Sequence, residues 1–215
     1  MITVSIKQKN KTLGVHERHF EVPSSWEELT LEQFNFIMSE KEMNEIKLLA
    51  ILTGLSEDYL SQLPADSLHI TGNYLSAMIG VPDISKWELP KRMLIDGKEY
   101  DVPTLEKQTF GQKVYLQEEL NRVNTDKRPF YDAFAFAIAT MFYSEISGDK
   151  HFTEEKVRAL IPVVLRTKAK QAIPVASFFL TSCARSLNAK KRTSVLNRLR
   201  RNLTRELTTS KSSES

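Results

Sequence analysis

The chain is poor in the residues that define several common classes of protein. Among 215 residues there is one cysteine, Cys183, so no disulfide can form within the chain and a cysteine-rich zinc site is excluded. A lone thiol flanked by small and apolar residues indicates a packed core side chain in a reducing compartment. Glycine occurs seven times and proline eight times, which is too few for a long flexible linker.

Long apolar runs are also missing. The N-terminal residues MITVSIKQKNK contain no apolar stretch of the length found in secretory signals. The most apolar segment, residues 130–146, is too short to span a bilayer and contains Asp132 and Glu145. We expect this segment to be a buried helix, and we expect a soluble intracellular protein that has no contact with a membrane.

The sequence contains none of the common motifs of enzyme sites. It has no glycine-rich phosphate loop, no GxSxG and no paired metal-ligand motif. His16 and His19 are three residues apart beside a predicted strand, and because residues at this spacing on a strand face opposite ways, the pair is poorly placed to share a metal. Carboxylate pairs such as Glu118 and Glu119 lie about 100° apart on predicted helices, which indicates solvated faces. We therefore expect a protein that is not an enzyme, with no catalytic residue, cofactor or metal. Residues that converge from distant parts of the chain stay an open alternative.

Local patterns in the first half predict a β-hairpin followed by helices. Residues 2–8 alternate apolar and polar side chains, and residues 18–22 are their predicted partner strand. Thr30 and Gln33 have the spacing of a capping box, so a helix should begin at Thr30. Three more helices are predicted: residues 42–54 ending at Gly54, a short helix after Ser56, and residues 65–79.

The second half contains the same kinds of signal. Asp96-Gly97 between two β-type runs predicts a type I′ hairpin turn within residues 92–102. Thr109 and Gln112 repeat the capping-box spacing, with a helix to about Val123. The remaining predicted elements are a helix at 130–146, a helix capped by Thr153 and bounded by Pro162, and a core element at 173–187.

Four short segments recur in the same order in both halves of the chain. They pair HFEVP with EYDVP, TLEQ with TFGQ, EIKLLAILTGL with DAFAFAIATMF, and LSEDYLSQLP with FTEEKVRALIP. The predicted fold class is therefore α+β, predominantly helical: an imperfect tandem duplication of a β-hairpin plus helices unit, with a C-terminal basic amphipathic helix. The alternative is that such signals recur in many α+β proteins. The expected segments are a first repeat at 1–86, a second repeat at 87–186 packed on the first, a docking helix at 187–208 and a polar tail at 209–215.

Basic residues are concentrated at the C-terminus. From Cys183 onward there are nine Lys or Arg and two Glu, a net charge of +7, whereas the other residues carry 21 basic and 25 acidic side chains, a net charge of −4. Apolar side chains at helical spacing face away from a set of arginines in this segment. The predicted partner-binding residues are Leu196, Leu199, Leu203, Leu207, Lys190, Lys191, Arg192, Arg198, Arg201 and Arg205.

Three partners fit this basic segment. The leucines can dock on the body of the same chain, or in a groove of another protein. Alternatively, the arginines can contact nucleic acid phosphates. We favour docking on protein because an amphipathic stripe needs an apolar partner, and no aromatic residues alternate with the basic ones as single-strand binding would require.

Residues 92–182 resemble small virion or morphogenesis proteins of tailed phages of Bacteroidota, including crAss-like phages. The resemblance rests on the passage DGKEYDVP followed by TFGQ and by the later FFL segment. It implies a component of the particle or of its assembly, such as a head–tail connector ring, a tail-assembly factor or a packaged protein. It implies a location in the virion, and in the host cytoplasm during assembly.

The leading hypothesis is thus a phage structural or assembly protein that acts by protein–protein contacts with other virion or assembly proteins. A homo-oligomer and a contact between the C-terminus and DNA are compatible with it. The alternative hypothesis is a nucleic-acid-binding protein that uses the C-terminal Arg/Lys helix.

Overall fold

The computed structural model describes residues 2–10, 14–40, 42–63 and 82–187 of the chain. These residues are mostly helical, with two antiparallel β-hairpins, so the α+β and mainly helical class predicted from the sequence is confirmed. The chain divides into two compact units, residues 1–82 and residues 83–215, which are called the first and second units below. The helix predicted at 65–79 and the one predicted at 187–208 lie almost wholly outside the described residues.

The first unit begins with a long β-hairpin. Strand β1 (Ile2–Asn10) pairs antiparallel with β2 (Gly14–Val22), so that Ile2 lies opposite Val22. Both strands are longer than the alternating pattern predicted, because main-chain pairing continues as far as Asn10 opposite Gly14. Ile6 and Val22 are buried, and helix α2 contacts β2, which joins the hairpin to the helices of this unit.

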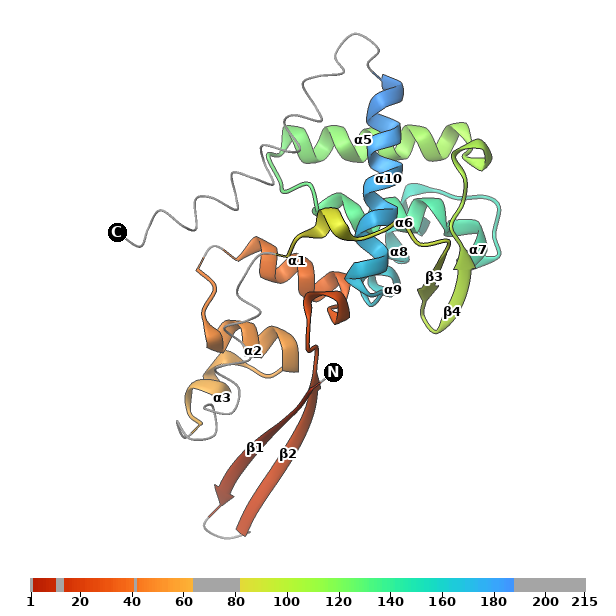
Figure 1. The fold of residues 1–215 in the computed structure, drawn as a ribbon. Helices are drawn as coiled ribbons and strands as arrows, with labels where there is room; N and C mark the ends of the chain where they lie inside the picture. The colour runs from red at the N-terminus through yellow and green to blue at the C-terminus, as the bar shows by residue number, and fades with distance from the viewer. Residues whose placement is uncertain (1, 11–13, 41, 64–81, 188–215) are drawn as a thin grey trace. The chain divides into compact units, whose positions relative to one another are not determined.

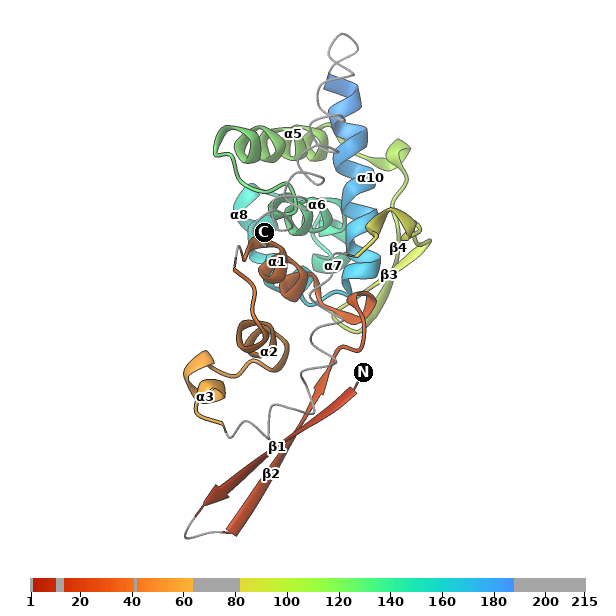
Figure 2. The same ribbon diagram turned by 60° about the vertical axis from the view of Figure 1, so that its left-hand side comes forward.

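A 3-10 turn, η1 (Trp26–Glu28), and three short helices follow: α1 (Leu31–Ser39), α2 (Glu45–Thr53) and α3 (Glu57–Ser61). The capping box at the start of α1 forms as predicted: the Gln33 amide donates to Thr30 Oγ1 at 3.2 Å, and the Thr30 amide donates to Gln33 Oε1 at 3.0 Å. Helices α2 and α3 lie side by side (Figures 1 and 2).

Helix α2 starts three residues later than the sequence pattern predicted. The side chain of Asn44 accepts a hydrogen bond from the Lys47 amide at 2.9 Å and so caps the helix there. An asparagine cap competes well with continued helix because it satisfies one of the amides that a helix start leaves unpaired. The predicted end is confirmed, since Gly54 has a φ of 71°, in the left-handed region that glycine tolerates.

The second unit opens with a 3-10 turn, η2 (Ile84–Lys86), and a short hairpin of β3 (Arg92–Ile95) and β4 (Lys98–Asp101). The predicted type I′ turn is confirmed, because Asp96 and Gly97 both have positive φ, at 50° and 78°. Met93 and Ile95 are fully buried, whereas the alternate residue Leu94 is 45% exposed. The hairpin therefore packs one face on the unit, and α10 contacts β3.

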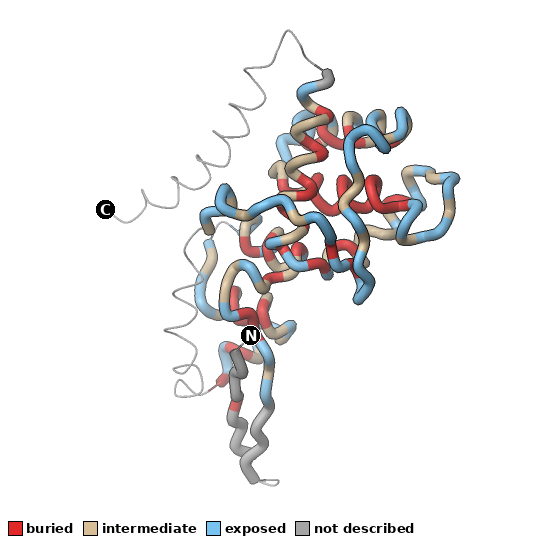
Figure 3. The backbone as a smooth tube through the Cα atoms, turned by 45° about the vertical axis from the view of Figure 1, so that its right-hand side comes forward, coloured by how far each residue is buried: buried red, intermediate tan, exposed pale blue. Residues whose placement is uncertain are grey.

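The helices of the second unit surround the apolar helix α6. After the 3-10 turn η3 (Leu105–Lys107) come α5 (Phe110–Thr125), α6 (Asp132–Met141), α7 (Tyr143–Ser147), α8 (Glu154–Ala159), α9 (Ile161–Leu165) and α10 (Ala169–Leu187). Helix α10 contacts α6 and crosses α5 (Figures 1 and 2), and α5, α8 and α9 also contact α6. Residues 133–142 are buried without interruption (Figure 3), so α6 is the centre of the core.

Three helix boundaries in the second unit differ from the prediction, at Phe142, Pro162 and Pro174. The helix predicted over 130–146 bends at Phe142, whose ring is fully buried and meets Tyr100 edge-on at 6.4 Å. Pro162 does not only bound α8 but lies in the first turn of α9, where a missing amide hydrogen has no cost. Pro174 lies inside α10, which begins at Ala169 rather than Ile173.

Candidate interaction surfaces and a buried charge cluster

A buried carboxylate joins helices α5 and α8 of the second unit. Glu119 of α5 is 2% exposed, and Arg158 of α8 donates a hydrogen bond from Nη2 to its Oε2 at 2.8 Å. Arg122 and Arg128 approach the same carboxylate at 3.6 Å and 3.5 Å. The prediction that Glu118 and Glu119 lie on a solvated face is wrong for Glu119. The two residues differ because the second one points into the packing between α5 and α8, a contact that the local pattern does not encode.

Glu154 completes this cluster. Arg122 donates to both of its carboxylate oxygens, and Arg158 Nε donates to Oε1 at 2.9 Å. The hydrogen bonds from Arg122 and then from Arg158 lower the pKa of Glu154 to about 2. The guanidinium of Arg158 also lies 4.7 Å from the centre of the Phe136 ring, which favours a cation over the aromatic face.

This arrangement is suited to holding helices together rather than to chemistry. Each carboxylate is hydrogen-bonded by a guanidinium that stays protonated, and the lowered pKa of Glu154 leaves that carboxylate poorly suited to accept a proton near neutral pH. Asp132 lies at the edge of the cluster, 3.9 Å from Arg128, and burial raises its pKa. We therefore assign the cluster to the stability of the unit: it links α5 and α8 above the Phe136 ring of α6.

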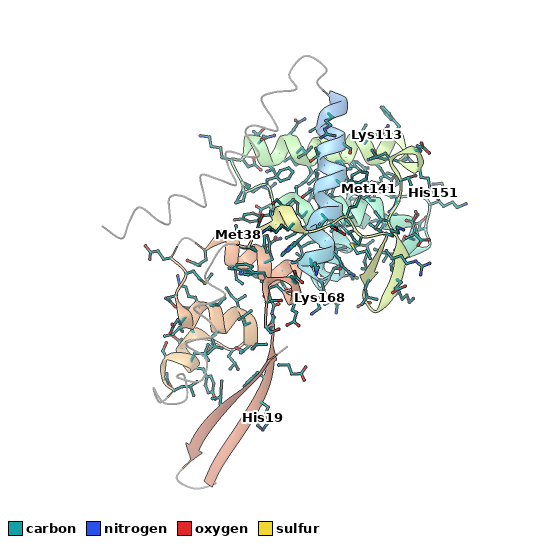
Figure 4. All side chains as sticks on the ribbon, in the orientation of Figure 1. His19, Met38, Lys113, Met141, His151 and Lys168 are labelled. Carbon is teal, nitrogen blue, oxygen red and sulfur yellow. The ribbon has the colours of Figure 1, made fainter. Side chains whose placement is uncertain are left out.

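The thiol of Cys183 is a core group, as the sequence indicated. It is 3% exposed, and its Sγ lies 3.5 Å from the carbonyl oxygen of Lys113, which sits on α5 beside α10 (Figure 4). Burial raises the pKa of this thiol, so the reactive thiolate is disfavoured. His19 and His151 are exposed, and in the parts of the chain that the structure describes no group of His, Cys, Asp and Glu could hold a metal ion.

The most exposed apolar side chain among the described residues is Phe110, at 83%. It is the first residue of α5, directly after the Thr109 cap. The next residue, Gly111, allows the Phe152 ring to approach, since a Cβ there would lie 3.1 Å from it, and Tyr115 meets the same ring edge-on at 5.3 Å. Phe110 thus stands outside an aromatic cluster, and Leu105 nearby in sequence is also exposed, at 36%.

A second exposed aromatic residue lies on α1 of the first unit. Phe36 is 54% exposed, while Leu31, Phe34 and Ile37 of the same helix are buried. Glu32 and Glu40 stand four residues before and after Phe36, with Glu32 in the first turn of α1 and Glu40 directly after its last residue, so the three positions lie along one side of the helix. We call this stripe of Glu32, Phe36 and Glu40 the α1 stripe. The sequence analysis did not single out either aromatic residue, because helical spacing alone does not show which side of a helix another element covers.

The partner-binding residues predicted from the sequence lie outside the described residues. All of them fall within 190–207, and the description ends at Leu187. The α1 stripe and Phe110 are the candidate interaction surfaces among the residues that the structure describes. Within the described ranges, no helix is long and apolar enough to cross a bilayer.

No protein-family model matches the chain, and no curated protein or solved structure matches it either.

Proposed function

We propose that this chain is a structural or assembly protein of a tailed phage, a connector or ring, tail-assembly or packaged component, which acts by protein–protein contacts and not by catalysis. The observation that carries the proposal is the exposure of Phe36 and Phe110, at 54% and 83%, each on a capped helix in a different unit. Aromatic side chains are enriched in the centres of protein interfaces, where they bury a large apolar area with little loss of side-chain freedom. The resemblance of residues 92–182 to phage virion and morphogenesis proteins, and the basic C-terminal segment, support the same function.

We also propose that the two units are an imperfect duplication. Both contain, in the same order, a hairpin, a 3-10 turn, a capping-box helix, an apolar helix and a short helix with acidic residues in its first turn. The first unit has β1–β2, η1, α1, α2 and α3 in these places, and the second has β3–β4, η3, α5, α6 and α8. The second copy would then be extended at the end of α5 and by α7.

Particle composition tests the proposed function. Particles of the phage that encodes this chain are purified and analysed by mass spectrometry, before and after cross-linking, and the gene is deleted in parallel. We expect mass spectrometry to find the chain in the particles, or the deletion to give incomplete particles. We also expect cross-links from the segments around Phe36 or Phe110 to other particle proteins. Normal, infectious particles from the deletion, with no trace of the chain in wild-type assembly intermediates, would contradict the proposal.

The alternative function is nucleic-acid binding, favoured by eight Lys or Arg against two Glu in residues 188–215. Phosphate contacts release counterions, so the affinity for duplex DNA should fall at least about tenfold between 50 and 200 mM salt. Absence of binding at the lower salt concentration would exclude this alternative, and an affinity unaffected by salt would contradict a phosphate-based contact.

A further inference from the structure

We infer that the α1 stripe binds the basic C-terminal segment of a second copy of this chain, so that copies associate head to tail. This inference rests on the proposed function, because it identifies one of the partners as the chain itself. It depends on three properties of the two surfaces: an exposed aromatic residue, equal spacing of opposite charges, and opposite net charge.

The α1 stripe combines an apolar centre with acidic ends. Phe36 leaves about half of its surface in solvent, and Glu32 lies one turn before it with its side chain exposed. Glu40 lies one turn after it, and Lys47 donates to Glu40 Oε1 at 2.9 Å, which lowers the pKa of Glu40 and keeps it ionised. The stripe from Glu32 to Glu40 spans eight residues, about 12 Å along a helix.

The C-terminal segment contains the same spacing with opposite charges. Arg192, Leu196 and Arg200 are also separated by four residues each. On the helix that the sequence predicts here, these three fall on the same side as Leu199 and Leu203. Their span is again about 12 Å, so Leu196 can face Phe36 while each arginine faces a glutamate. The equal spacing allows this in either relative direction of the two helices.

The net charges of the two regions are complementary as well. Residues 1–82 carry six Lys or Arg and eleven Asp or Glu, a net charge of −5, whereas residues 188–215 carry eight basic and two acidic residues, a net charge of +6. Opposite fields of this kind accelerate encounter and fix the register of a contact. The other exposed aromatic residue is a poorer partner for a basic segment, because exposed Lys107 and Lys113 lie three residues either side of Phe110.

A contact between two different surfaces of identical copies repeats from copy to copy. Such a heterologous contact builds a closed ring when the rotation between copies closes, and an open filament when it does not. A stripe that recognises the tail of the next copy therefore provides the kind of growth that a ring or tail component needs.

The test exchanges charges between the two surfaces in the full-length protein. One variant has E32R and E40R, the other has R192E and R200E, and the association of each is measured by sedimentation velocity over a range of concentrations and salt. We expect each variant alone to self-associate at least about tenfold more weakly than wild type, since like charges then face each other. An equimolar mixture of the two variants should associate again. The arginines introduced in the stripe of one variant then face the glutamates introduced in the C-terminal segment of the other, and the two unchanged surfaces pair as in wild type.

Matched controls separate this contact from a general effect of charge. E57R with D58R makes the same change in charge as E32R with E40R, but on exposed positions of α3. R201E with R205E makes the same change as R192E with R200E, but on the side of the predicted helix away from Leu196. Both should associate like wild type, and F36A should weaken association where F110A does not. Because E40R places a cation beside Lys47, E32R alone is also mixed with R192E or R200E, and each variant's fold is checked by circular dichroism.

Three results would overturn the inference: a wild-type chain that stays monomeric at all concentrations, a mixture that fails to associate, or controls that weaken association as much as the stripe variants. Association that disappears on nuclease treatment would overturn it too, and would assign the segment to nucleic acid. In each case the presence of the chain in particles, measured independently, decides the proposed function separately.

Discussion

At the scale of single residues, the second unit depends on a carboxylate that has been removed from water. Arg158 donates a hydrogen bond to the buried carboxylate of Glu119, and Arg122 and Arg128 lie close to it. Ion pairs of this kind add little stability over a well-packed apolar core, but removal of one partner leaves a buried charge uncompensated. The structure therefore predicts large effects for truncation within the cluster and small ones for exposed pairs.

Replacement of Arg158 by alanine should destabilise the protein by about 2–4 kcal/mol, because Glu119 loses its shortest hydrogen bond and Phe136 loses the cation above its ring. Urea denaturation measures this difference. R166A is the matched control: Arg166 pairs with Asp96 at 3.5 Å with both side chains 63% exposed, so it should cost below about 0.5 kcal/mol. Equal effects of the two changes would show that the cluster is not important for stability.

Acid should weaken the same cluster. Arg122 and Arg158 lower the pKa of Glu154 from 4.5 to about 2 in the folded protein, so its contribution is fully present above pH 4.5 and is lost as the pH falls toward 2. E154Q should lower stability at pH 7 and flatten the fall between pH 4.5 and 2. Urea midpoints at several pH values test this. If the urea midpoints of wild type and E154Q fell in parallel between pH 4.5 and 2, Glu154 would not be the source of the acid sensitivity.

At the scale of elements, local side-chain chemistry accounts for where most helices and turns begin and end. Thr30 and Thr109 form complete capping boxes, Ser56 and Thr153 accept from the amides three residues on, and Gly97 allows the hairpin turn. These interactions involve residues within four positions of one another, so the sequence pattern predicts them. The bend at Phe142 has a tertiary cause, because Phe142 packs on Tyr100 of β4. The structure does not explain why α10 contains Pro174.

The cap of α5 offers a direct measurement. T109A removes the acceptor for the Gln112 amide and should destabilise the protein by about 1 kcal/mol. T104A is the control, since Thr104 precedes η3 and makes no side-chain cap hydrogen bond. Thermal denaturation of the two variants should show a lower midpoint for T109A only. A comparable loss in T104A would mean that the threonines act through something other than capping.

At the scale of the whole molecule, charge is unevenly distributed along the chain, and the C-terminal 28 residues hold most of the positive excess. If the C-terminal segment binds a second copy of the chain and does not pack on its own chain, residues 1–187 do not need it to fold.

A chain that ends at Leu187 should therefore unfold at nearly the same temperature as the full-length monomer, within about 2 °C, because the contact that we infer for residues 188–215 is with a second copy. The same chain should no longer self-associate. Differential scanning calorimetry at low protein concentration measures the first effect, and sedimentation velocity at high concentration measures the second. A midpoint several degrees lower would indicate that the segment stabilises its own chain.

The sequence by itself determined the mainly helical α+β class, both hairpins, the two capping boxes and the apolar helix α6, because each depends on neighbours along the chain. Only the tertiary structure decided that Glu119 is buried while Glu118 is exposed, and that Phe36 and Phe110 are exposed while Leu31 and Phe34 are not. Helical spacing shows which residues share a side of a helix. Whether another element covers that side depends on packing between segments that are far apart in the sequence.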